Sequence, residues 1–243
     1  MDRLICFAHR GASGHSPENT LAAFKKAVEL AADWIELDVY AVADELVVIH
    51  DSRLERTTNG KGYVSRRGLA YLRNLDAGGG EKIPFLREVF DVTGRRLRIN
   101  IELKGRGTAS PTCDLIEFYV KKRKWRYDDF LLSSFDHKQI RQAKKRCPEI
   151  PIAPNLNSNR LCYTRWEGLM KPYSIHCDLA HATPALIDRI HRHNCRAFVF
   201  TVNRAEEIQR LAAMGVDGVF TNYPELITGK RVKKKQAYIP AGA

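Results

Sequence analysis

Short apolar runs alternate with amphipathic stretches along most of the 243-residue chain. Eight of the apolar runs predict buried strands. They cover residues 4–8, 34–38, 97–103, 130–133, 150–153, 174–177, 197–202 and 217–220. Helical patterns lie between them; the first has Asn19 or Thr20 as its N-cap and places Leu21, Phe24 and Val28 on one face. Eight strand and helix alternations in about 240 residues predict an α/β fold, the (β/α)8 TIM barrel.

A further apolar run, residues 46–50, follows the second expected strand after only a few residues. The gap is too short for a crossover between parallel strands, so the run predicts the returning arm of a β-hairpin. If the turn lies near residues 43–45, antiparallel pairing brings His50 to within about one residue of Asp38.

Polar side chains gather where the expected strands end. In a barrel the carboxyl ends of the strands form the functional rim, and residues two apart on a strand lie on one face. A buried acid is destabilising unless something pairs with it, so these groups should meet. The residues in question are His9, Arg10, Glu36, Asp38, His50, Glu102 and Lys104.

The residue types indicate a metal and a phosphate. Glu36, Asp38 and Glu102 offer an all-oxygen donor set, which suits one hard divalent cation, Mg²⁺ or Ca²⁺, better than zinc. Arg10 and Lys104 beside such a cation suit a phosphate group.

Two histidines complete the set. His9 and His50 can donate and accept protons near neutral pH. The assembly therefore predicts a metal-assisted attack on a phosphodiester. Asp51 either orients a histidine or caps the following loop, and the cap is the preferred interpretation.

Charge and length limit the remaining possibilities. The net charge of +12 suits nucleic acid, an anionic membrane or a small phosphorylated substrate, but no zinc-finger, basic-zipper or RNP-like pattern accompanies it, so we expect no specific nucleic-acid partner. No stretch reaches 18 uninterrupted apolar residues and the first apolar run is too short for a signal peptide. We expect a cytoplasmic protein without stable membrane insertion, with one catalytic domain over residues 1–228 and a basic polar tail over residues 229–243.

Ten stretches spread over nearly the whole chain resemble the glycerophosphodiester phosphodiesterases, and within that family the cytoplasmic bacterial enzymes. The stretches are AHRGASGHSPENTLAAF (8–24), IELDV (35–39), VVIHD (47–51), LERTTNGKG (54–62), LDAG (75–78), IPFLREVF (83–90), NIELK (100–104), LLSSF (131–135), FTVN (200–203) and DGVFTNYP (217–224).

The resemblance implies a role for each matched residue and a substrate class. It makes His9 and His50 the acid/base pair, and it makes a (β/α)8 barrel the fold, with a small insertion at residues 52–82 after the hairpin near strand 2. The reaction it implies converts a glycerophosphodiester and water to glycerol-3-phosphate and an alcohol. It gives metal binding to Glu36, Asp38 and Glu102, and phosphate binding to Arg10 and Lys104.

Two positions depart from the family pattern. The hairpin turn usually contains Asp-Gly, where this chain has Asp44-Glu45. The aromatic before "TVN" is commonly Trp and is Phe200 here, which either stacks on the glycerol portion of the substrate or belongs to the strand core. Phe135 likewise either contacts the substrate or belongs to the hydrophobic core, and the core is the preferred interpretation.

Two other functions stay open at this point. A lysophospholipase D would use the same site on longer lipids, and a non-catalytic phosphate- or nucleic-acid-binding barrel would keep the fold without the reaction. The head group, the oligomeric state, and the choice between direct attack by water and a cyclic phosphate intermediate are not determined by the sequence.

Overall fold

Eight parallel strands close into a barrel in the computed structural model, which describes residues 3–157 and 171–231. The barrel closes because β1 pairs with both β2 and β9, so the fold expected from the sequence is confirmed. In order around the barrel, the strands are β1 (Ile5–Ala8), β2 (Trp34–Val42), β4 (Arg98–Leu103), β5 (Phe130–Ser134), β6 (Ile152–Leu156), β7 (Ser174–Asp178), β8 (Arg196–Phe200) and β9 (Gly218–Thr221).

Strand β3 (Glu45–Val48) pairs antiparallel with the end of β2 and forms the expected hairpin. Val42 faces Glu45, so the turn consists of residues 43 and 44 rather than the Asp44-Glu45 pair, and Ala43 takes a positive φ of 51°. The backbone N–H of Ile49 donates to the carbonyl of Asp38 at 3.0 Å. His50 therefore lies one residue from Asp38 across the hairpin, as expected.

Two strands, β2 and β6, run well beyond their predicted ends. β2 runs to Val42 instead of ending at Asp38, since its second half pairs with β3. β6 begins at Ile152 and runs to Leu156, past Pro154 and Asn155, which the search for apolar runs had excluded. A barrel interior accepts polar side chains near its functional end, so apolar content underestimates strand length there.

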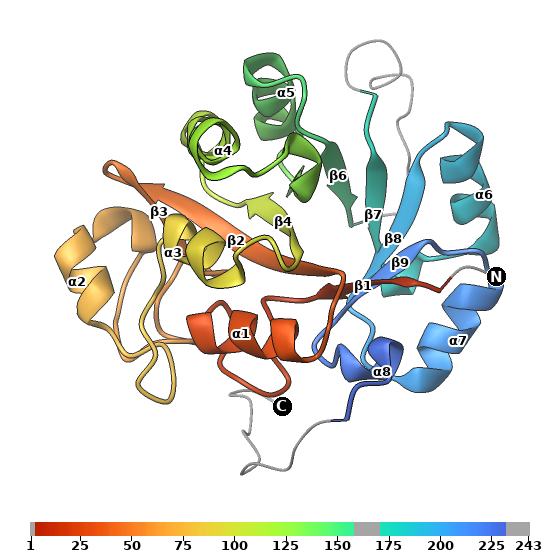
Figure 1. Cartoon of the computed structure of the whole chain (residues 1–243), viewed down its shortest axis with the longest axis horizontal. Coiled ribbons are helices and arrows are strands. Elements are labelled where there is room, and N and C mark those ends of the chain that lie inside the picture. The colour runs from red at the N-terminus through yellow and green to blue at the C-terminus, as the bar shows by residue number, and fades with distance from the viewer. Residues whose placement is uncertain (1–2, 158–170, 232–243) are drawn as a thin grey trace.

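Helices surround the barrel (Figure 1). The first begins after Thr20, whose hydroxyl accepts the N–H of Ala23 at 3.3 Å, which resolves the choice between the two N-cap candidates. The helices are α1 (Leu21–Glu29), α3 (Leu86–Thr93), α4 (Ala109–Arg123), α5 (His137–Arg146), α6 (Pro184–Arg192), α7 (Ala205–Ala213) and α8 (Glu225–Thr228), with short 3-10 turns at Tyr127–Asp129 and Leu179–His181.

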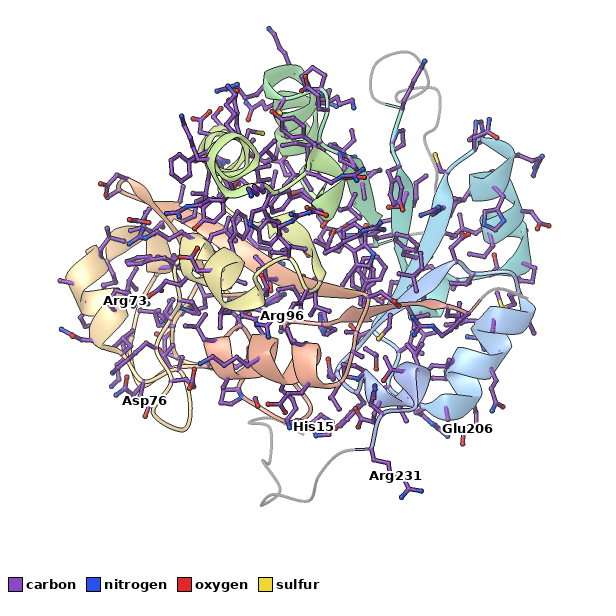
Figure 2. All side chains as sticks on the ribbon, viewed as in Figure 1. His15, Arg73, Asp76, Arg96, Glu206 and Arg231 are labelled. Carbon is purple, nitrogen blue, oxygen red and sulfur yellow. The ribbon has the colours of Figure 1, made fainter. Side chains whose placement is uncertain are left out.

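The segment expected as an insertion, residues 52–82, lies beside the hairpin at one end of the molecule (Figure 1). It contains a 3-10 turn (Val64–Arg66) and the short helix α2 (Leu69–Asn74), and Arg73 and Asp76 are labelled in this region in Figure 2. A separate small core packs it against the hairpin. That core contains Val42, Val47, Ile49, Leu54, Val64, Leu72, Leu75, Ala77 and Ile83.

A cluster of aromatic rings fills part of the barrel interior. Phe7 stacks on Phe220 with ring centroids 4.5 Å apart and lies 4.7 Å from Phe198. Trp34 joins this cluster, and the alternation of β2 then places Glu36 and Asp38 on the same interior side further along the strand. The apolar layer thus ends where the acidic residues begin.

Candidate active site

The three carboxylates expected to bind a metal lie together. Strand alternation puts Glu36 and Asp38 on the interior face of β2, and the parallel register places Glu102 of β4 directly beside Asp38. Ligand oxygens of the three residues lie within 4.8 Å of one another. Over residues 3–157 and 171–231, this is the one group of histidine, cysteine or acidic side chains close enough to share an ion.

The hydrogen bonding of these acids fits a hard cation. Asp38 accepts from the amide of Asn19 at 2.9 Å through Oδ2, whereas its buried Oδ1 accepts no hydrogen bond. Glu36 accepts the backbone N–H of Arg10 at 2.8 Å. Oxygen donors with an unused buried lone pair are what Mg²⁺ or Ca²⁺ needs, so these residues could hold either ion.

The pKa shifts of these acids also favour a bound cation. Burial, together with the neighbouring carboxylates, raises the pKa of Glu36 well above its usual value and raises the pKa of Glu102 to about 7. Burial also raises the pKa of Asp38, but His50, Lys104 and Arg10 outweigh this effect and hold the pKa below its usual value. Three crowded acids without a cation are therefore poorly tolerated as a fully ionised set.

His9 follows β1 and is held by the end of β9. Its Nδ1 lies 2.8 Å from Oδ1 of Asn222, and its backbone N–H donates to the carbonyl of Thr221 at 2.9 Å. An amide oxygen can only accept, so Nδ1 carries the proton and Nε2 is the free acceptor. Burial, and then the charge of Arg10, lowers the pKa of His9 to about 4.

His50 follows β3 and lies between an acid and a lysine. Its Nδ1 is 2.5 Å from Oδ1 of Asp51, and its Nε2 is 3.2 Å from Nζ of Lys104. Asp51 thus orients the histidine, and the preferred interpretation of Asp51 as a loop cap was wrong. Burial lowers the pKa of His50, although Asp38 opposes the shift.

The two cations expected to contact phosphate both lie next to the acids. Lys104 donates to Glu102 at 3.0 Å, and the Nε of Arg10 lies 3.8 Å from Asp38. Arg10 also donates to Glu18 at 2.8 Å. Both cations are buried for the most part, so an anion placed between them would interact with them away from bulk water.

All eight residues singled out from the sequence line one cavity of about 170 Å³. Phe200 is half-buried at this cavity, and its ring meets the ring of Phe135 edge-on at 5.8 Å. Phe135 is 42% exposed, so its expected place in the core was wrong. β5 ends one residue earlier, at Ser134, which leaves the Phe135 ring in the loop beyond the strand.

Several polar residues of the site were not singled out from the sequence. Asn222 follows the last strand, and its place directly after an apolar run was a usable signal. The interior of the cavity also carries Asn100, Ser133, Asn155 and His176.

The model of the glycerophosphoryl diester phosphodiesterase family matches residues 9–226. The chain belongs to this family. This glycerophosphodiester phosphodiesterase is thereby a phosphoric diester hydrolase, and the resemblance drawn from its motifs is confirmed. Hydrolysis of glycerophosphodiesters is the reaction of the family.

Individual relatives match this chain over most of their length. A glycerophosphodiester phosphodiesterase of Caldanaerobacter subterraneus subsp. tengcongensis is 36% identical, with 93% of this chain and 96% of the relative covered. The structure of an Oleispira antarctica phosphodiesterase in complex with the product sn-glycerol-3-phosphate matches with a TM-score of 0.84 and 31% identity, covering 93% of this phosphodiesterase and 96% of that chain. Human lysophospholipase D GDPD1 is 24% identical, with 89% of this chain and 82% of the relative covered.

The helices do not suggest a membrane span. Among the residues that the structure describes, none of the helices combines the length and the apolar character needed to cross a bilayer.

Proposed function

We propose that this phosphodiesterase hydrolyses glycerophosphodiesters to glycerol-3-phosphate and an alcohol in a reaction that depends on one divalent cation, with His9 and His50 as the acid/base pair. The observation that carries the proposal is the convergence of three carboxylates, two histidines and two cations on one cavity. A site that needed only to bind phosphate would have no use for three buried acids.

The cations and the acids have separate tasks. Arg10 and Lys104 would hold the non-bridging oxygens of the phosphodiester and orient phosphorus for attack. Glu36, Asp38 and Glu102 would hold Mg²⁺ or Ca²⁺, which would supply a Lewis acid that draws negative charge from the phosphoryl group.

The histidines move the protons. An oxygen nucleophile attacks phosphorus as the bond from phosphorus to the head-group oxygen breaks. One imidazole accepts the proton of the attacking hydroxyl group, and the other donates a proton to the departing alkoxide, so that charge does not build up on either oxygen. Asn222 and Asp51 fix the two Nδ1 protons, so the exchange falls to the Nε2 atoms, and Nε2 of His50 must first give up its 3.2 Å contact with Nζ of Lys104.

The aromatic residues at the cavity would contact the carbon skeleton of the substrate. Phe200 lines the cavity and Phe135 lies against it, so a glycerol backbone bound at the phosphate site would meet the face or edge of these rings.

The deciding measurement is the release of glycerol-3-phosphate from glycerophosphocholine. Turnover should disappear with EDTA and return when Mg²⁺ or Ca²⁺ is restored. Turnover that survives complete removal of metal would exclude the metal-dependent reaction.

The half-exposed ring of Phe135 gives one reason to test longer lipids, because an alkyl chain could also lie against it. A lysophospholipase D would release lysophosphatidic acid from lysophosphatidylcholine faster than it would hydrolyse glycerophosphocholine. A non-catalytic barrel would hydrolyse neither, and its binding to DNA would fall with salt and persist in His9→Ala.

A further inference from the structure

Arg56 lies in the 52–82 segment and bridges two acids of different loops. Its guanidinium donates two hydrogen bonds to Glu18, both of 2.8 Å, and two to Asp51, of 2.6 and 3.0 Å. An arginine fork that satisfies two carboxylates at once has a defined orientation, unlike a single surface ion pair.

Each of these acids reaches a residue of the catalytic cavity. Glu18 accepts from the guanidinium of Arg10 at 2.8 Å, and Asp51 faces Nδ1 of His50 at 2.5 Å. One continuous chain of charged groups therefore runs from Arg10 to His50 and passes through Arg56 outside the cavity.

We propose that Arg56 is a positioning residue that fixes His50 through Asp51 and Arg10 through Glu18. The inference deepens the proposed function and rests on it. Asp51 lies in the loop after β3 and has 28% of its side chain exposed, so its carboxylate could turn to solvent without a partner. The arginine holds both carboxylate oxygens of Asp51, and this fixes the oxygen that faces the imidazole.

The fold of the 52–82 segment does not depend on this side chain. The loop is held by its own backbone, since the N–H of Leu54 donates to Gly62 and the N–H of Thr58 donates to Leu54, both at 3.0 Å. The Arg56 side chain is 39% exposed and is absent from the small core. Its removal should therefore leave the fold intact and act on the cavity.

The test uses Arg56→Ala and a matched control, Arg53→Ala. Arg53 lies in the same loop and also forms an exposed ion pair, with Glu55 at 2.6 Å, but it does not reach the cavity. We expect kcat of Arg56→Ala to fall by about 10- to 100-fold, the usual cost of losing a group that orients a functional side chain. Thermal stability, and its rise on adding Mg²⁺, should match those of wild type, and Arg53→Ala should keep wild-type kcat.

Two further measurements separate positioning from a merely structural role. In Asp51→Asn, which keeps the size of the side chain and removes its charge, the additional loss from Arg56→Ala should be much smaller than in wild type, because both changes break one chain of contacts. Guanidinium ion at low concentration should restore part of the lost kcat of Arg56→Ala, since a cavity of about 370 Å³ beside Arg56 gives it access. Sodium chloride at the same ionic strength should not restore kcat.

The outcomes distinguish this inference from the proposed function. An active wild type whose Arg56→Ala variant keeps full kcat would overturn the positioning role and leave the hydrolase assignment standing. If the losses of kcat from Asp51→Asn and Arg56→Ala simply added in the variant that carries both, action of Arg56 through Asp51 would equally be overturned. A wild type inactive on every glycerophosphodiester would instead refute the proposed function itself. If Arg56→Ala lost its fold, Arg56→Lys would be measured instead. A folded Arg56→Lys variant with wild-type kcat in the absence of added guanidinium ion would show that the forked guanidinium of Arg56 is not needed.

Discussion

Replacing Glu102 by glutamine tests the metal site directly. The substitution keeps the shape of the side chain and an oxygen that Lys104 can still reach, as it does now at 3.0 Å. It removes one of three negative charges whose ligand oxygens lie within 4.8 Å of one another. The expected result is loss of metal-dependent turnover without loss of the folded state.

The expected changes in folding stability follow from two terms, the repulsion between the carboxylates and the free energy of cation binding. Two unit charges 4.8 Å apart repel by about 3.5 kcal/mol at an effective dielectric constant of 20, before Arg10 and Lys104 compensate part of it. Glutamine removes this repulsion, so the metal-free variant should be at least as stable as metal-free wild type. A cation at about 100 times its Kd stabilises wild type by about 2.7 kcal/mol, a rise in Tm of roughly 5–10 °C for a chain of this size.

The assay is thermal unfolding with EDTA and with Mg²⁺ or Ca²⁺. Wild type should gain several degrees with the cation and Glu102→Gln should gain almost none, while the control Glu206→Gln, on the distant α7 (Figure 2), should behave as wild type. Burial raises the pKa of Glu102 to about 7, so the folded state binds more protons than the unfolded state and metal-free wild type should lose stability as pH rises from about 4.5 to about 7. A Glu102→Gln variant that unfolds well below metal-free wild type, or that keeps the full cation effect, would refute the reasoning.

Three further predictions concern other parts of the molecule. His9→Ala and His50→Ala should each lower kcat by about 10²- to 10⁴-fold with the cation-induced rise in Tm retained, and unchanged turnover in either variant would remove that histidine from the mechanism. Gly11→Ala should destabilise the fold by about 1–3 kcal/mol in urea unfolding, because the glycine has φ +79° and an added Cβ would lie 2.7 Å from the backbone of Ala23; wild-type stability would show that the loop can relax. Burial lowers the pKa of His176 to about 3, so the unfolded state binds the extra proton and stability should fall as pH drops from about 6.5 toward 3, by at most about 1.4 kcal/mol per pH unit. A His176→Asn variant should show a shallower acid dependence, and an equal slope would contradict this account.

Strand periodicity made the carboxylate cluster predictable. The period of two is strict, so Glu36 and Asp38 had to share a face, and neighbouring parallel strands that end at one rim had to bring Glu102 beside them. The short hairpin placed His50 for the same reason, since only antiparallel pairing fits so few connecting residues. These inferences needed only local pattern and the geometry of a sheet.

Other features depend on contacts that local pattern does not contain. The partners of Asp51 and Glu18 were missed because Arg56 reaches both from a loop, and loop conformation follows from long-range packing rather than from periodicity. Phe135 was misplaced because a large apolar side chain directly after a buried strand favours the core, whereas its ring lies in the loop beyond Ser134 and is 42% exposed against Phe200.

The net charge of the cavity affects how strongly it attracts the phosphodiester group. A bound divalent cation would keep all three acids ionised, and together with Arg10 and Lys104 it would give the cavity a net charge of about +1, which suits the single negative charge of a phosphodiester group. In the metal-free protein the raised pKa values of Glu36 and Glu102 let these acids hold protons, so Arg10 and Lys104 lose the help of the divalent charge in attracting the phosphodiester. EDTA should therefore weaken the binding of glycerophosphocholine as well as abolish its turnover, and calorimetric binding of unchanged affinity to the metal-free protein would show that the cation does not contribute to binding in this way.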